Sequence, residues 1–183
     1  MKRTLRVALG RISLLMVGVQ VRLLARRVGS AGVLVLDIDN TLADTWPSLL
    51  PGVDPKDRLA RLEPLPGMHA ATVGRAGDRP VVYLSHRFLW QAPVTWTWLR
   101  RQGYPVRMHS LMLVPTAADK LKPLGSLAAL GPVEYWDDLS FGHEHGEVQF
   151  YQELIDQVRA MPIAFHDFQA IGDTVDAARG SEE

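Results

Sequence analysis

Two carboxylates stand one residue apart at the end of an apolar run. The run 33–36 leads directly into Asp37 and Asp39, and Thr41 follows. Paired carboxylates repel one another, so each favours a nearby cation or a proton. Mg²⁺ is a suitable cation because it takes oxygen ligands, often one or two carboxylates together with phosphate oxygens. In that setting Asp37 could attack phosphorus, Asp39 could protonate the leaving oxygen, and Thr41 could donate its hydroxyl to the phosphoryl group.

The stretch LVLDIDNTL at residues 34–42 resembles the first motif of the haloacid dehalogenase (HAD) superfamily. Most members of that superfamily are magnesium-dependent phosphotransferases with an aspartate nucleophile. The resemblance therefore implies an aspartyl-phosphate on Asp37, with Asp39 as general acid and base. The segments SHR at 85–87 and TWTWLRRQGYP at 95–105 are loosely similar to the branch that contains the phosphatase domain of polynucleotide kinase-phosphatase. The likeness covers residues 33–168.

A second apolar run ends in Ser85, followed by His86 and Arg87. Ser85 resembles the second HAD motif, whose hydroxyl binds the transferring phosphoryl group, although a serine here is also suited to cap a helix. Arg87 is a candidate for binding substrate phosphate because a guanidinium offers a bidentate fork. We add His86 and Trp46 as candidate substrate-binding residues, and Trp46 is equally suited to a buried position.

Lys120 begins a predicted helix and resembles the third HAD motif, which neutralises the nucleophile and the phosphoryl oxygens. Lys122 lies about 200° further around such a helix and is expected to face solvent. The pair Asp137 and Asp138 ends another predicted strand and resembles the fourth motif. Asp138 is the expected magnesium ligand, and Asp137 is expected to support Lys120 or a metal-bound water. The predicted metal site thus comprises Asp37, Asp39, Asp137 and Asp138.

Two other segments contain side chains that could bind a metal ion. The sequence GDTVD at 172–176 matches an alternative form of the fourth motif, with Asp173 as its ligand, but few residues follow it. We interpret 169–183 as a C-terminal tail. His143, Glu144 and His145 could bind a transition metal, but their spacing is typical of no known site and favours a polar loop in which His143 or His145 touches substrate.

The elements that must position these residues alternate between strands and helices. Such alternation predicts an α/β fold, a doubly wound and mostly parallel Rossmann-like sheet with helices on both faces. About forty residues separate Thr41 from the next strand, so little or no cap domain is expected. The catalytic domain is predicted to span 32–168. Strands are expected at 33–36, 79–87, 109–114, 133–138 and 162–168, and helices at 67–75, 92–102, from 120 onward, and at 148–161.

The N-terminal segment 1–31 is predicted to be a basic amphipathic helix. Residues 1–30 carry seven basic residues and no acid, while the rest of the chain has 13 basic and 20 acidic residues. Its longest uncharged run, 12–21, is too short to span a bilayer. The helix could dock on the domain, form a homo-oligomer, or lie on an anionic membrane surface. We therefore expect a cytoplasmic protein with possible peripheral membrane contact, and no specific nucleic-acid site is evident.

Composition sets the remaining bounds. The 183 residues are 47% hydrophobic and 22% charged, as in a globular domain. The chain has no cysteine, which excludes disulfides and thiolate chemistry. The predicted function is Mg²⁺-dependent hydrolysis of a phosphorylated substrate, either a small molecule or an exposed phosphate end. The alternative is a catalytically weak or silent HAD-like binding module, recruited to a partner or an anionic membrane by its N-terminal helix.

Overall fold

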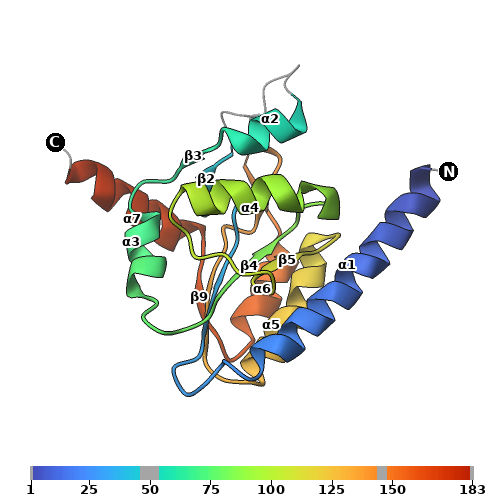
Figure 1. Ribbon diagram of the computed structural model, residues 1–183. Coiled ribbons are helices and arrows are strands. Elements are labelled where there is room, and N and C mark those ends of the chain that lie inside the picture. The colour runs from blue at the N-terminus through green and yellow to red at the C-terminus, as the bar shows by residue number, and fades with distance from the viewer. Residues whose placement is uncertain (1, 46–53, 144–147, 182–183) are drawn as a thin grey trace.

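Short apolar runs form a five-stranded parallel sheet at the centre of the computed structural model, which describes residues 2–45, 54–143 and 148–181 (Figure 1). The strands lie in the order β5-β4-β1-β6-β9. This confirms the predicted α/β class and all five predicted strands, and the order is consistent with a Rossmann-like fold. Their bounds are β1 (Val33–Leu36), β4 (Val81–Ser85), β5 (Leu111–Leu113), β6 (Val133–Trp136) and β9 (Ala164–His166).

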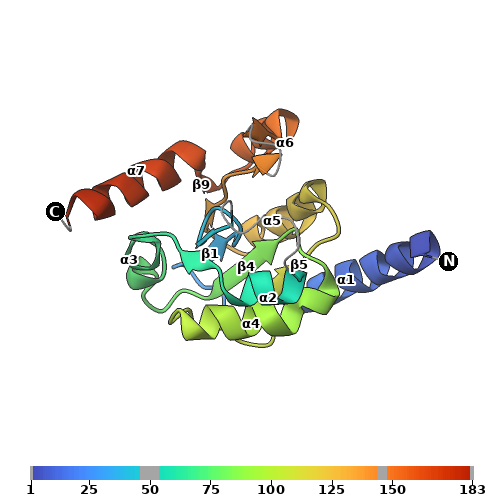
Figure 2. The same cartoon turned by 90° about the horizontal axis from the view of Figure 1, so that it is seen from above.

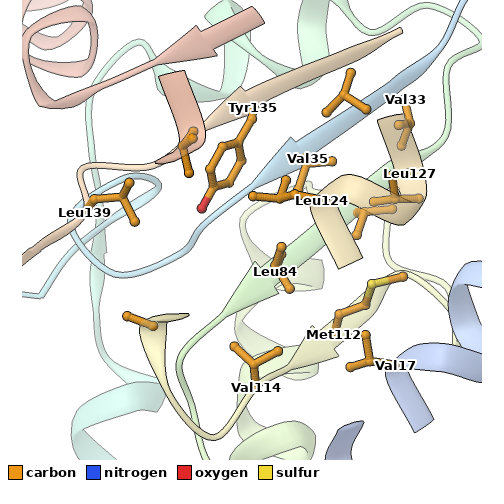
Figure 3. Close-up of a cluster of buried hydrophobic side chains, with 14 of the residues drawn as sticks. Val17, Val33, Val35, Leu84, Met112, Val114, Leu124, Leu127, Tyr135 and Leu139 are labelled. Carbon is orange, nitrogen blue, oxygen red and sulfur yellow. The ribbon is translucent and has the colours of Figure 1, made fainter. Parts of the chain in front are cut away.

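The uninterrupted apolar run of β1 is explained by burial on both faces, since none of its four side chains is exposed. Val33 and Val35 belong to one buried cluster (Figure 3), which includes residues of α1 (Lys2–Leu24), α5 (Leu121–Ala128) and α6 (Gln152–Arg159). Leu34 and Leu36 belong to a second cluster, on the opposite face. Figure 2 shows α4 and α5 on opposite sides of the sheet. The second cluster includes residues of α2 (Pro55–Ala60), α3 (Met68–Ala71), α4 (Ala92–Arg101) and α7 (Phe168–Gly180).

The connections carry short elements. In its described part, the connection from β1 to β4 contains the antiparallel ribbon β2–β3, the short helices α2 and α3, and a 3₁₀ turn. This length is consistent with the expectation of little cap structure. A second ribbon, β7–β8, follows β6. The bounds are β2 (Ala43–Asp44), β3 (Glu63–Pro64), β7 (Ser140–Phe141), β8 (Gln149–Phe150), η2 (Val73–Arg75), η3 (Leu89–Gln91) and η4 (Ala117–Lys120).

Three sequence-based elements need correction. Residues 169–180 of the expected tail 169–183 instead belong to helix α7, with Asp167 as its N-cap and with Ile171 and Val175 buried against the domain. The helix expected over 148–161 is shorter because its first residues pair in the β7–β8 ribbon. The helix expected over 67–75 is divided into α3 and η2 at Thr72, whose backbone leaves the helical region.

Helix α1 docks one face on the domain. Val17 and Leu24 are buried in the first cluster, Gln20 Nε2 donates to Leu111 O at 2.9 Å, and Ser13 Oγ donates to the carbonyl of the last β5 residue. Its stretch 7–24 has a mean hydropathy of 1.7 and, by length and composition alone, could cross a membrane. Only 22% of this stretch is buried against the domain. Of the three alternatives for this helix, docking is therefore present, and it leaves the other face uncovered.

Candidate active site

The carboxyl ends of β1 and β6 bring three aspartates together. The parallel ladder continues beyond the strands, because Asp37 N donates to Trp136 O at 2.9 Å and Asp137 N donates to His166 O at 3.1 Å. One carboxylate oxygen from each of Asp37, Asp137 and Asp138 lies within 4.8 Å of the others, and all three residues are buried. The sequence-based placement of these aspartates at one edge of the sheet is confirmed.

A tight turn after β1 carries Thr41 back to this cluster. Ile38 O accepts hydrogen bonds from Leu42 N and Ala43 N, both at 2.9 Å, and Asn40 has a left-handed backbone with φ of 54°. Asparagine tolerates this region better than most residues, which suits it to the turn. Thr41 is fully buried, and its Oγ1 accepts a hydrogen bond from Asp138 N at 3.3 Å. The threonine hydroxyl therefore links the β1 turn to the acidic pair.

Lys120 reaches into the same cluster from the end of η4. Its Nζ lies 2.6 Å from Asp137 Oδ2 and 3.1 Å from Asp37 Oδ1, and its side chain is buried. Burial alone would lower the pKa of Lys120, but the charges of Asp137 and Asp37 outweigh burial and raise that pKa. Lys122 is exposed, so the preference for Lys120 agrees with the structure. Tyr135 supports the pair because its hydroxyl donates to Asp137 Oδ2.

The cluster holds more negative than positive charge. Burial, the largest cause, together with the charges of Asp137 and Asp39, raises the pKa of Asp37 from 3.8 to about 7 against the opposing effect of Lys120. Burial, together with the charges of Asp137 and Asp37, raises the pKa of Asp138 well above its ordinary value. Asp37 Oδ1 is buried and is paired with Lys120 Nζ at 3.1 Å. Three carboxylates facing one ammonium leave two negative charges when ionised, and this donor set fits one Mg²⁺ ion.

Asp39 lies apart from this group and forms a different ion pair. Arg87 donates from Nε to Asp39 Oδ2 and from Nη2 to Asp39 Oδ1, both at 2.7 Å. Thr45 Oγ1 also donates to Asp39 Oδ1, at 2.9 Å. Burial, the largest cause, would raise the pKa of Asp39, but the charge of Arg87 and the hydrogen bonds from Arg87 and Thr45 together hold that pKa below its ordinary value. We predicted that the Asp39 carboxylate is part of the metal site. In the structure it is paired with Arg87 and lies outside the cluster of three aspartates.

Arg87 also differs from its predicted role. We expected its guanidinium to face the substrate phosphate, but the side chain is only 3% exposed. Its Nη1 donates to Thr95 Oγ1 at 2.9 Å, and two of its other nitrogens are paired with Asp39. In this arrangement the guanidinium is a support for Asp39, and a substrate phosphate would have to compete for it.

Some of the residues predicted to contact the substrate line one small cleft, whereas Arg87 and Thr41 do not. Ser85, at the end of β4, and the exposed His86 lie in its wall together with Asp138 and Ser140. The cleft encloses about 110 Å³. Pockets for whole small-molecule ligands enclose about 300–1,000 Å³. The cleft therefore has the size for a phosphoryl group, and the rest of a substrate would lie outside it.

The remaining candidates are placed as follows. His143 is buried beside the cluster, with Nε2 at 3.9 Å from Asp138 Oδ2. Asp173 lies on α7, accepts a hydrogen bond from the Gln169 side chain at 2.7 Å, and is not in the cleft wall. Trp46, Glu144 and His145 fall outside the described residues.

Sequence reasoning missed several supporting residues. The Ser140 hydroxyl donates to Asp138 Oδ2, and the Tyr135 hydroxyl donates to Asp137 Oδ2. In each pair the donor and the acceptor are two residues apart in the sequence. The spacing of two along an extended backbone was a usable signal for Tyr135, since such side chains share a face. It was none for Ser140, because Leu139 between it and Asp138 has a left-handed backbone with φ of 45°. Thr45 and Thr95 gave no comparable signal, because their contacts with Asp39 and Arg87 depend on how separate elements pack.

Comparisons with known protein families, with curated proteins and with solved structures found no match for this chain. The geometry around the buried aspartates and the sequence resemblance are thus the two grounds for interpreting the site.

Proposed function

We propose that the protein is a Mg²⁺-dependent phosphomonoester hydrolase of the HAD type, with Asp37 as its nucleophile. The observation that carries the proposal is a cluster of three buried carboxylates, Asp37, Asp137 and Asp138, beside the buried ammonium of Lys120. Buried charge is costly unless it is paired or bound to metal. A divalent cation would supply the positive charge that this cluster lacks.

Asp37 and Asp138 would hold the ion, and Asp137 would keep Lys120 in place. When bound, Mg²⁺ would reduce the repulsion between the phosphate and the carboxylate that attacks it. The Lys120 ammonium would neutralise the remaining charge on the nucleophile and the phosphoryl oxygens. The hydroxyls of Ser85 and Thr41 would orient the phosphoryl group.

The reaction would proceed in two displacements. In the first, an Asp37 oxygen forms a bond to phosphorus while the bond to the leaving oxygen breaks, and Asp39 gives its proton to that oxygen. In the second, water attacks phosphorus and gives a proton to Asp39, while the bond between phosphorus and Asp37 breaks. Inorganic phosphate leaves, and both aspartates return to their starting states.

The ion pair with Arg87 opposes the first proton transfer, because it keeps Asp39 deprotonated. A phosphate that enters the cleft brings oxygens to which the same guanidinium fork can donate. Competition for Arg87 would release Asp39 and let it take up a proton. Substrates with good leaving groups need less of this help, so an aryl phosphate should be the most permissive probe of activity.

The same ion pair is the observation that favours the alternative, a weakly active or silent binding module. The two functions are separated by hydrolysis of p-nitrophenyl phosphate with Mg²⁺ or with EDTA, using wild type, Asp37→Asn and the control Asp173→Asn. We expect Mg²⁺-dependent turnover in wild type and in the control. Asp37→Asn should lose at least about 99% of the rate, as expected when a covalent nucleophile is removed. Absence of turnover in folded wild type, or turnover in Asp37→Asn within tenfold of wild type, would overturn the proposal.

A further inference from the structure

An apolar groove runs beside the catalytic cleft. It lies between the N-terminal half of α1, the η3 turn and the loop after β5, and it encloses about 570 Å³. Phe88 and Trp90 are 51% and 46% exposed, and their rings stack with centroids 6.2 Å apart. A contiguous patch of exposed apolar side chains is typical of a site that binds a ligand, a protein or a membrane. Its apolar lining includes Val7, Leu9, Leu14, Phe88, Trp90 and Pro115.

Adjacent residues of the chain line the groove and the cleft at two places, although no residue lines both. On one side, His86 lines the cleft while the next residue, Arg87, lines the groove. On the other, Lys120 lines the cleft while Asp119 lines the groove. The two spaces are therefore neighbours across two short loops. A substrate with its phosphate in the small cleft could cross these loops and place an apolar chain in the groove.

The uncovered face of α1 carries a second apolar surface, whose residues do not line the groove. Ile12, Leu15, Val19 and Leu23 are 47%, 73%, 52% and 55% exposed. At 100° per residue they fall within an arc of roughly 80°, directed away from the docked face. Arg22 lies at one border of that arc, in a segment whose first 30 residues carry seven basic residues and no acid. An apolar stripe with a basic border is the pattern of a helix that lies in the surface of an anionic membrane.

We propose that the substrate is a lipid phosphate, a phosphomonoester with a long apolar chain, and that the protein meets it at an anionic membrane surface on which the outer face of α1 lies. This rests on the proposed phosphatase activity and names its substrate class. Charge decides between a membrane and a second copy of the chain. Two copies joined symmetrically through this stripe would bring two acid-free basic segments together, whereas anionic lipid headgroups complement them.

The substrate part is tested by comparing butyl phosphate with dodecyl phosphate, which have similar leaving groups and differ in chain length. We expect kcat/KM to be at least about tenfold higher for the dodecyl ester, because burying only a few methylenes contributes that much. Trp90→Ser should remove most of this preference and leave p-nitrophenyl phosphate turnover unchanged. The control Phe168→Ser, at another exposed aromatic residue on α7, should keep the preference.

The membrane part is tested by sedimentation with vesicles of phosphatidylglycerol and phosphatidylcholine or of phosphatidylcholine alone. Wild type should bind the anionic vesicles, more weakly as salt rises. Leu15→Glu should reduce binding at least about tenfold, and Phe168→Glu should not. Three results would overturn this inference alone, provided that p-nitrophenyl phosphate turnover is normal. They are the absence of a chain-length preference, the absence of vesicle binding, and a stable dimer formed through α1. Absence of turnover would overturn the phosphatase proposal itself.

Discussion

Lys120→Met tests the charge arrangement on which the site depends. Methionine keeps much of the length of the side chain and removes the ammonium that lies 2.6 Å from Asp137 and 3.1 Å from Asp37. Removing one partner of a buried ion pair costs about 3–5 kcal/mol, because the other charge stays buried and unpaired. Since small domains are stable by about 5–15 kcal/mol, this change should be large but should leave a folded protein.

The destabilisation should depend on pH. The pKa values of Asp37 and Asp138 are raised already in the presence of the lysine, and its removal should raise them further. Protonation relieves the repulsion among the carboxylates, so the variant should lose less stability at pH 5 than at pH 8. The assay is urea unfolding in EDTA, followed by far-UV circular dichroism at both pH values. The slope of free energy against urea should be unchanged, since the surface exposed on unfolding is the same.

Lys122→Met is the matched control, because Lys122 lies two residues away and is exposed. Its effect should stay within about 0.5 kcal/mol, as for most surface substitutions. The reasoning would be refuted if both variants unfolded at the same urea concentration, or if Lys120→Met lost as much stability at pH 5 as at pH 8. Either result would mean that the lysine does not compensate the buried carboxylates.

The other predictions concern the metal, the acidic pair and the arginine. Because burial raises the pKa of Asp37 to about 7, the ion-free protein should lose stability as pH rises from 3.8 through 7. Mg²⁺ should therefore raise Tm more at pH 8 than at pH 5, which calorimetry can measure. Asp138→Ala should abolish Mg²⁺-dependent turnover of p-nitrophenyl phosphate, and Asp173→Ala should not; the opposite pattern would move the metal site to α7. Thr95→Val should leave an N–H of Arg87 unpaired and cost about 1–3 kcal/mol in urea unfolding, and an unchanged midpoint would show that this contact is dispensable.

The sheet and the acidic cluster could be predicted because their signals are local. Most of the strands are short apolar runs; Asp37 follows β1 directly, Ser85 is the last residue of β4, and Asp137 and Asp138 follow β6. Parallel strands end at one edge of a sheet, so residues at strand ends come together without any knowledge of their side-chain directions. Lys120 could be predicted for a similar reason, because it stands at the start of a helix. The packed face of that helix can be inferred from the spacing of its leucines.

Arg87 shows where this reasoning ends. Its type and position suggested a phosphate ligand, but its direction is set by Asp39 and by Thr95 on α4. Such contacts depend on the distance between separate elements, which no local pattern encodes. Helix α7 was missed for a different reason. Only Ile171 and Val175 are buried on it, and the preceding polar residues obscured a helix that begins at the Asp167 cap.

The docking of α1 has a consequence for solubility. Strand β5 is at the border of the sheet, and within the part of the chain that the structure describes it pairs only with β4. A strand in that position offers free backbone groups on which another chain can add itself, which is a common start of aggregation. Ser13 and Gln20 occupy two of its carbonyls, and the helix covers the strand. Full insertion of α1 into a bilayer would expose this strand. If the outer face of α1 meets lipid while its inner face stays docked on the domain, the strand stays protected. The candidate cleft is then held at a fixed orientation to the membrane surface.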